Sequence, residues 1–228
     1  IEVIYAWRRA NKKLFSIWQE YVKHGGQDTF FEYHFPHIAR PATSGMLSPD
    51  VKLSMLSRVF GKNNISIIDY DAAAKVDNLL DLFCGLVGLK DASELTVPLQ
   101  DKNASNKSMK FHESELLRAL NCHFALTSNV TGVAVRLAFN ENKAQLNQNL
   151  LQDLLKIIEK DVIHVNADKY FIDQRSENVL TNKFEHCLVN YEESLLVNSF
   201  SISSQKWLVD ERARSMFESL SNQLRKFL

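Results

Sequence analysis

The chain has 228 residues, 45% of them hydrophobic, and is therefore long enough to bury the core of one large domain or two small ones. Its 27 basic and 27 acidic residues give a formal net charge of zero, which argues against a general nucleic-acid-binding protein with a basic face. The three cysteines form no Cys-x-x-Cys pair, which argues against a zinc or thioredoxin-like site, and no apolar run is long enough to span a membrane.

The beginning of the chain predicts a strand followed by helices. Residues 1–7 form an apolar run rich in β-branched side chains, which indicates a buried strand. Apolar residues recur at helical spacing over 12–23, and Gly25 and Gly26 predict the end of that helix. The aromatic stretch 29–35 predicts a short helix or turn.

A second strand follows further along the chain. We predict a loop over 36–41, between two prolines, and a helix over 48–60, which opens with a Ser-Pro-Asp start signal. Residues 65–68 form another apolar strand. The acidic residues within 69–71 come at its carboxyl end, where a polar strand end or a helix cap is the default interpretation.

The rest of the chain is predicted to be mostly helical, with a polar loop over 91–110 and helices over 75–86, 112–124, 146–158, 184–197 and 207–227. Two buried strands joined by helices indicate an α/β fold with a parallel sheet. Because two strands do not make a stable sheet of this class, we expect further strands upstream of Ile1 or in a partner chain. We predict an α/β domain over 1–125 and a helical extension over 126–228 that packs on it.

A basic pair, Arg8-Arg9, follows the first strand, and Ser16 comes eight residues after Arg8. Ligands of open α/β sheets bind at the carboxyl ends of the strands, where the strand places Arg8. A guanidinium and a hydroxyl are suitable hydrogen-bond donors to a phosphate. The alternative interpretation is a solvated arginine pair at a strand end and a small helix residue.

The stretch from Tyr5-Ala6-Trp7-Arg8 to Ser16-Ile17-Trp18 resembles the segment of sulfotransferases that binds the 3′-phosphate of 3′-phosphoadenosine 5′-phosphosulfate. That segment consists of an apolar strand, an arginine, seven intervening residues and a serine followed by aromatic residues. The spacing from Arg8 to Ser16 is kept, and Trp18 supplies the aromatic residue. Arg9 stands where many eukaryotic members have asparagine, whereas bacterial carbohydrate-type members often have a second arginine.

Three later segments extend the resemblance in the same order. Residues 58–70 are similar to a family segment that consists of a helix, a Phe-Gly pair, a basic residue and a strand. Residues 76–89 are similar to a family helix that ends in a Leu-Gly-Leu type stop. Residues 106–121 are similar to the Asn-x-Ser … Leu-Leu-Arg-x-Leu-Asn segment of bacterial members, and after Asn121 only the helical character matches. The resemblance implies a P-loop-type parallel sheet that lacks its N-terminal strands, so that the chain is the C-terminal portion of a bacterial or algal carbohydrate-type sulfotransferase-like protein.

The resemblance also implies the chemistry. A sulfuryl group would pass from 3′-phosphoadenosine 5′-phosphosulfate, a co-substrate, to a hydroxyl or amine acceptor such as a carbohydrate, without a metal. Arg8 and Ser16 would hold the 3′-phosphate of the donor. The phosphosulfate-binding loop and the catalytic base are expected upstream of Ile1, so these residues alone are expected to be inactive. The resemblance leaves the compartment open between the cytoplasm and, in a eukaryote, the Golgi lumen.

Residues that would bind the acceptor are less well specified. Two histidines and an arginine around the predicted 36–41 loop are candidates, although turn or surface histidines are the commoner interpretation: His34, His37 and Arg40. Two other functions stay open. A non-catalytic, helix-rich interaction or regulatory module fits the helical second half, and a P-loop kinase relative fits the spacing from Arg8 to Ser16 less well.

Overall fold

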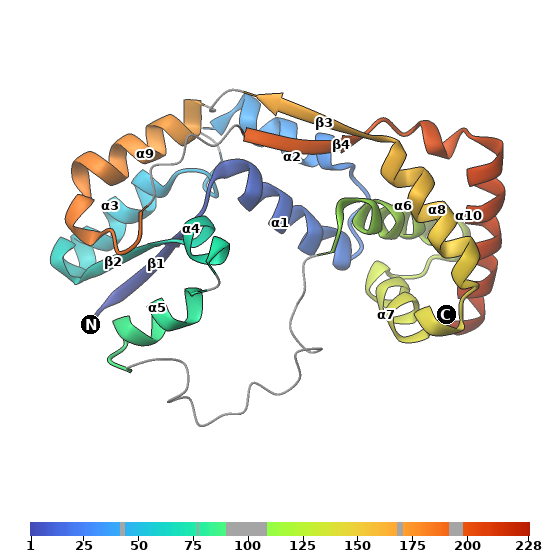
Figure 1. The fold of residues 1–228 in the computed structure, drawn as a ribbon, viewed down its shortest axis with the longest axis horizontal. Coiled ribbons are helices and arrows are strands. Elements are labelled where there is room, and N and C mark those ends of the chain that lie inside the picture. Colours follow the sequence, from blue (N-terminus) through green and yellow to red (C-terminus); the bar gives the residue numbers. More distant parts are fainter. Residues whose placement is uncertain (42–43, 77, 90–108, 168–170, 192–197) are drawn as a thin grey trace. The chain divides into compact units, whose positions relative to one another are not determined.

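The computed structural model describes residues 1–41, 44–76, 78–89, 109–167, 171–191 and 198–228 (Figure 1). Its strands and α-helices are, in chain order, β1 (Val3–Trp7), α1 (Ala10–Lys23), α2 (Phe30–Ala39), α3 (Pro49–Phe60), β2 (Ile65–Asp69), α4 (Tyr70–Lys75), α5 (Leu79–Leu86), α6 (Phe111–Ser128), α7 (Gly132–Asn142), α8 (Gln148–Lys160), β3 (Val162–Ala167), α9 (Phe171–Lys183), β4 (Asn198–Ser203) and α10 (Glu211–Leu224). The described chain is therefore a helix-rich α/β protein.

The chain divides into two compact units, each built from three separate stretches of sequence. The first unit contains residues 1–13, 37–106 and 167–198, and the second contains residues 14–36, 107–166 and 199–228. The predicted boundary between residues 125 and 126 stays a prediction. No helix in the described part of the chain is long and apolar enough to cross a membrane.

The first unit is built on a parallel pair of strands. β1 pairs with β2 in a register that runs from Val3 opposite Ile65 to Trp7 opposite Asp69, which confirms the predicted parallel pair. α3 packs against both strands and α9 packs against α3 (Figure 1). The apolar core between the strands and these helices consists of Trp7, Leu53, Ile65, Ile67, Leu180, Phe184 and Cys187.

A short segment extends this sheet on the far side of β2. Leu188 forms a single parallel bridge with Ile67, and the backbone N–H of Val189 donates to the Ile67 carbonyl at 3.0 Å. Among the described strands, β1 pairs with β2 alone. The structure therefore shows a small parallel sheet of two strands with a rudimentary third.

Some predicted elements differ from the observed ones. α2 continues through Pro36 to Ala39, so the loop predicted over 36–41 begins later. The helix predicted over 184–197 is wrong in its described part, because residues 184–191 contain a 3₁₀ turn and the bridge to β2. The helix of that region is α9, which was not predicted and precedes it. Most of the predicted 91–110 loop lies outside the described residues.

The second unit uses α6 to cap the carboxyl end of α1. The Asn121 side-chain amide donates to the carbonyls of Val22 at 2.8 Å and Gly26 at 3.1 Å. One turn earlier, Arg118 Nη1 donates to the Gln27 carbonyl at 3.0 Å. These bonds tie α6 to the last turn of α1 and to the residues that follow it. Within this unit, the arginine and asparagine of the Leu-Leu-Arg-x-Leu-Asn segment therefore hold the chain together.

Arg118 is itself neutralised inside the second unit. Its guanidinium donates to both carboxylate oxygens of Glu115, at 3.0 and 2.7 Å, and to the side-chain oxygen of Gln205 at 2.9 Å. Glu115 is fully buried and Arg118 nearly so. The charge of Arg118 is thus paired within the unit, and its hydrogen bond to the Gln27 carbonyl anchors the turn after α1.

A close approach of two backbones generates the first prediction. Gly25, with φ of +98°, lies against Gly132 at the start of α7, and a Cβ added at Gly132 would overlap the Gly25 Cα. Gly132→Ala is therefore expected to lower the free energy of unfolding by about 1–3 kcal/mol or more, because backbone has to move. Gly85→Ala is the control, since a Cβ there meets nothing and alanine favours the helix. Equal urea midpoints for the two variants would contradict this contact.

His123 generates a pH prediction. Its Nε2 is buried without a hydrogen-bond partner among the described residues, and its ring meets the edges of Phe124 and Phe217. Burial lowers the pKa of His123 and Arg225 lowers it further, whereas Glu218 raises it. Below about pH 6.5 the imidazole is therefore protonated in the unfolded chain but stays neutral in the folded one, so the free energy of unfolding falls as the pH falls. Above that pH no stability is lost through this group.

The measurement is the urea midpoint from pH 8 down to pH 5 for the parent and for His123→Phe. We expect the variant to lose less stability over the acidic part of the range. The two profiles should run parallel at alkaline pH, where the imidazole is neutral in both states. Profiles that stay parallel throughout would show that His123 carries none of the acid sensitivity.

Candidate functional site

The candidate site lies where β1 and β2 end side by side. Trp7 and Asp69 are paired in the parallel register, so the residues that follow each strand emerge at the same edge of the sheet. Arg8 and Arg9 follow β1, and Asp71 follows β2 within the first turn of α4. The basic pair and the acidic residues, which the sequence places far apart, thus meet in the first unit.

Arg9 forms a buried, bidentate ion pair with Asp69. The Nη1 and Nη2 nitrogens of Arg9 donate to the two carboxylate oxygens of Asp69 at 3.1 and 3.2 Å. Both side chains are almost completely buried, and the guanidinium lies 4.9 Å from the centre of the Trp7 ring. The interpretation of Arg8-Arg9 as a solvated pair is therefore wrong for Arg9, which joins the ends of the two strands.

Asp69 is held by further bonds. One of its oxygens accepts from the backbone N–H groups of Asp71 and Ala72, each at 3.1 Å, and so caps α4, the helix-cap alternative of the two that the sequence left open. The side chain of Asn190 binds the backbone of Asp69 twice, accepting from its N–H at 2.8 Å and donating to its carbonyl at 3.0 Å. These bonds fix both the backbone and the carboxylate at the end of β2.

Asp71 orients Arg8. One carboxylate oxygen of Asp71 accepts from Arg8 Nε at 3.1 Å, and the other accepts from the backbone N–H of Arg9 at 3.0 Å. The Arg8 guanidinium also lies 4.8 Å from the centre of the Tyr70 ring. No described residue accepts a hydrogen bond from either Nη nitrogen of Arg8, whose side chain is 29% exposed. Arg8 therefore keeps one edge of its guanidinium available to a ligand.

Two carboxylates of the protein occupy the amino end of α1. Asp71 accepts from the backbone N–H of Arg9, and Asp173 of α9 accepts from that of Ala10 at 2.9 Å. A helix amino end attracts anions because its first N–H groups lack partners and the helix dipole is positive there. Here Asp71 and Asp173 occupy the N–H groups of Arg9 and Ala10, so these two donors are not available to an anion at this edge.

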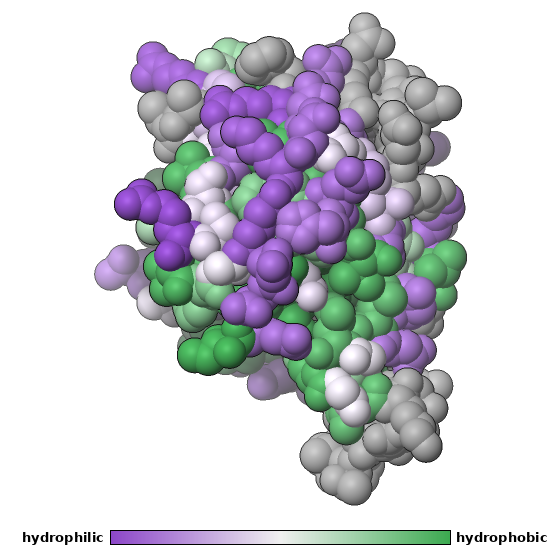
Figure 2. All heavy atoms as spheres, turned by 90° about the vertical axis from the view of Figure 1, so that its left-hand side faces the viewer, coloured by the Kyte–Doolittle hydropathy of each residue, from purple (hydrophilic) through white to green (hydrophobic). Residues whose placement is uncertain are grey.

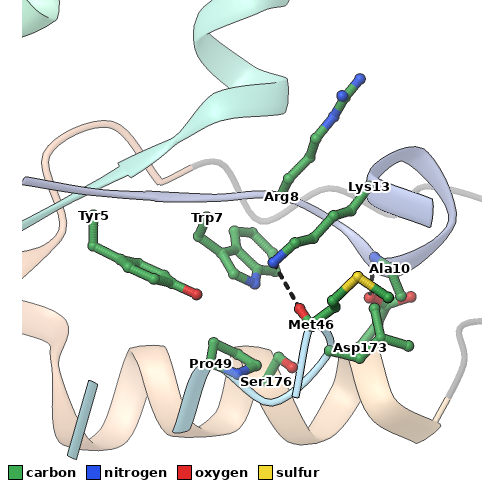
Figure 3. Close-up of a pocket in the computed structure, with 10 residues that line it drawn as sticks. Tyr5, Trp7, Arg8, Ala10, Lys13, Met46, Pro49, Asp173 and Ser176 are labelled. Atoms are coloured by element: carbon green, nitrogen blue, oxygen red, sulfur yellow. Dashed lines mark hydrogen bonds between the residues drawn. The ribbon is translucent and has the colours of Figure 1, made fainter. Parts of the chain in front are cut away.

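A small cavity lies beneath the start of α1 (Figure 3). Its volume of about 10 Å³ suits a single water molecule, which excludes a nucleotide or a sugar. Lys13 points into this region and donates to the Met46 carbonyl at 2.6 Å, whereas Arg8 extends away from the cavity (Figure 3). The pKa of Lys13 is lowered by burial and by the nearby charge of Lys52. The pKa of Tyr5 is raised by burial.

The other predicted site residues are divided between the two units. Ser16 is half-buried on α1 within the second unit, whereas Arg8 belongs to the first. His34 is buried on α2 in the second unit, where its ring stacks on Phe200 at 4.8 Å. His37 and Arg40 belong to the first unit, in which His37 Nδ1 lies 3.0 Å from the Ser44 hydroxyl and Arg40 is exposed.

Sequence reasoning missed three residues of this edge. Asp71 was assigned to a strand end or helix cap and not to Arg8, and neither Lys12 nor Asp173 was singled out. The available signal was the pair of acidic residues at the carboxyl end of β2, since parallel neighbours bring their carboxyl ends together. Within the described residues, no group of three or more His, Cys, Asp or Glu side chains is placed to hold a metal ion.

Comparisons with protein-family models, with curated proteins and with solved structures found no match to this chain.

The buried Arg9–Asp69 pair generates a stability prediction. Asp69→Asn removes the carboxylate to which both Nη nitrogens of Arg9 donate and leaves Asp71, 3.7 Å from Nη1, as the nearest counter-charge. We expect the free energy of unfolding to fall by about 3–5 kcal/mol. The control is Asp50→Asn, because Asp50 pairs with Arg175 near the surface at 2.5 Å and such pairs contribute about 1 kcal/mol or less. Denaturant unfolding measures both variants. A loss for Asp69→Asn as small as that of the control would contradict a central role for this pair.

Proposed function

We propose that the chain is part of a sulfotransferase-like domain and that Arg8 binds the 3′-phosphate of 3′-phosphoadenosine 5′-phosphosulfate. The observation that carries the proposal is the outward edge of the Arg8 guanidinium at the carboxyl end of a parallel strand, the edge at which open α/β sheets bind ligands. The spacing from Arg8 to Ser16 supports it from the sequence. Under this proposal β1 and β2 are neighbouring strands of a P-loop-type sheet.

Arg8 would position the donor and would not carry out the transfer. An arginine can bind a phosphate through two parallel N–H donors, and Asp71 already holds Arg8 by its Nε edge, which leaves the Nη nitrogens for that purpose. In the reaction the sulfuryl group passes from the donor phosphate to an acceptor oxygen or nitrogen. Adenosine 3′,5′-bisphosphate leaves and a base takes the acceptor proton. The role of Arg8 is to fix the position of the donor nucleotide by binding its 3′-phosphate.

Ser16 and the acceptor residues complete the proposal from the sequence. Ser16 would add a hydroxyl donor to the same 3′-phosphate, and a carbohydrate is the proposed acceptor. His34, His37 and Arg40 remain candidates for that acceptor. His34 contributes less readily in the conformation described, because it is buried against Phe200.

The test measures nucleotide affinity by calorimetry on the 228-residue chain. Adenosine 3′,5′-bisphosphate should bind more tightly than adenosine 5′-monophosphate, which lacks only the 3′-phosphate. Arg8→Gln should remove about 2 kcal/mol of the affinity for the bisphosphate, as expected for lost hydrogen bonds to a charged group, and should abolish its advantage over the monophosphate. Arg58→Gln is the matched control, because Arg58 is an exposed arginine on α3 of the same unit.

Because Arg8→Gln also removes the ion pair with Asp71, a melting curve of this variant is needed as a control that it still folds. If folded Arg8→Gln binds the bisphosphate as tightly as the parent, the assignment of Arg8 is wrong. If the parent does not distinguish the two nucleotides, the proposed donor is wrong.

A non-catalytic interaction module is the second candidate, and exposed apolar side chains of the first unit favour it. Val51, Met55 and Val59 are spaced four residues apart on α3 and are 52%, 63% and 74% exposed. Figure 2, which faces the side of the molecule with α3 and α5, shows apolar side chains gathered beside a hydrophilic band. Contiguous exposed apolar surface often marks a protein-binding site. Absence of any stabilisation by excess bisphosphate in a melting assay would favour this candidate.

A further inference from the structure

We propose that Lys12 is a second ligand of the phosphate at this edge, so that Arg8 and Lys12 together form a site for a doubly charged phosphomonoester. The inference rests on the proposed function and extends it to a residue that the sequence pattern does not include. Lys12 lies in the first turn of α1, four residues after Arg8, and belongs to the same unit.

Charge is unevenly distributed at the ends of β1 and β2. In the ion-pair cluster, three cations, Arg8, Arg9 and Lys12, lie within 4 Å of the carboxylates of Asp69 and Asp71, while Asp173 binds the backbone N–H of Ala10. The buried Arg9 forms a bidentate pair with Asp69, so the outer part of the cluster has two cations for the one carboxylate of Asp71. That part consists of Arg8 and Lys12, which share Asp71.

Arg8 and Lys12 lie on the same side of Asp71, against one of its oxygens. Arg8 Nε lies 3.1 Å and Lys12 Nζ lies 3.9 Å from the same oxygen of Asp71. The Lys12 ammonium is beyond hydrogen-bond distance of that oxygen, and its side chain is 48% exposed. Lys12 is therefore held near Arg8 by charge alone, with its donors available to a ligand that reaches the Nη edge of Arg8.

The charges at this edge favour a particular class of anion. The amino end of α1 is occupied by Asp71 and Asp173, so an anion at this edge gains nothing from the N–H groups of Arg9 and Ala10. It also lies near the negative charge of Asp71. A phosphomonoester carries close to two negative charges and three acceptor oxygens, so it gains more from a second cation than a singly charged carboxylate or phosphodiester does. A terminal ribose phosphate has this chemistry.

The experiment uses calorimetry at low ionic strength with three probes: adenosine 3′,5′-bisphosphate, adenosine 5′-monophosphate and inorganic phosphate. Lys12→Gln is expected to weaken binding of the bisphosphate and of inorganic phosphate about tenfold, the size of one charged hydrogen bond. Lys12→Arg, which keeps the positive charge, should recover most of the lost phosphate affinity. Lys52→Gln is the control, because Lys52 is an exposed lysine on α3 of the same unit.

The probes separate this inference from the proposed function. If Lys12→Gln binds both phosphates like the parent while Arg8→Gln does not, the role of Lys12 is overturned and the function stands. If inorganic phosphate binding depends on Lys12 but the bisphosphate has no advantage over the monophosphate, the site stands and the nucleotide function falls. If the parent binds none of the probes, both are overturned.

Discussion

The ion pair between Arg9 and Asp69 is the interaction on which the first unit depends. It joins the ends of two strands that lie about sixty residues apart in the sequence, and it does so with both partners buried. A buried charge is tolerated only when its partner and its hydrogen bonds are in place. The network around Asp69 meets that requirement, because backbone N–H groups of α4 and the side chain of Asn190 bind the same residue.

Arg8 and Arg9 are neighbours in the sequence with different tasks. Successive side chains at the end of a strand point to opposite sides, so one arginine enters the interior while the other stays at the edge. Arg9 is 4% exposed and neutralises Asp69, whereas Arg8 is oriented by Asp71 and keeps its outer nitrogens available. The buried arginine thus holds the acidic residues that orient the exposed one, and this division connects the stability of the unit with the proposed function.

Much of the local structure of the first unit could be predicted from the sequence, because the signals are local. The two apolar runs became β1 and β2, Asp69 caps α4, and Gly61 ends α3 with φ of +83°. The error over 184–197 has a physical cause, since the apolar residues Phe184 and Leu188 pack into the sheet core and suit a bridge as well as a helix.

The candidate site was predicted only in part for a related reason. Arg8 could be recognised from its place after a strand. Its partner Asp71 depends on the register of β1 against β2, and Asp173 comes from α9, a helix with little amphipathic pattern that sequence analysis did not detect. Lys12 has no distinguishing local signal, because a lysine in the first turn of a helix is commonly solvated. Long-range pairing, which a single sequence does not reveal, decides which of these charges is left for a ligand.

The most direct test of this account is a crystal structure of the chain with adenosine 3′,5′-bisphosphate. We predict that the 3′-phosphate lies within hydrogen-bond distance of the Nη nitrogens of Arg8 and of Lys12 Nζ, with the Arg9–Asp69 pair unchanged. A nucleotide bound elsewhere, with Arg8 and Lys12 turned away from its phosphates, would contradict the central claim that the outer charges at the ends of β1 and β2 form the ligand site.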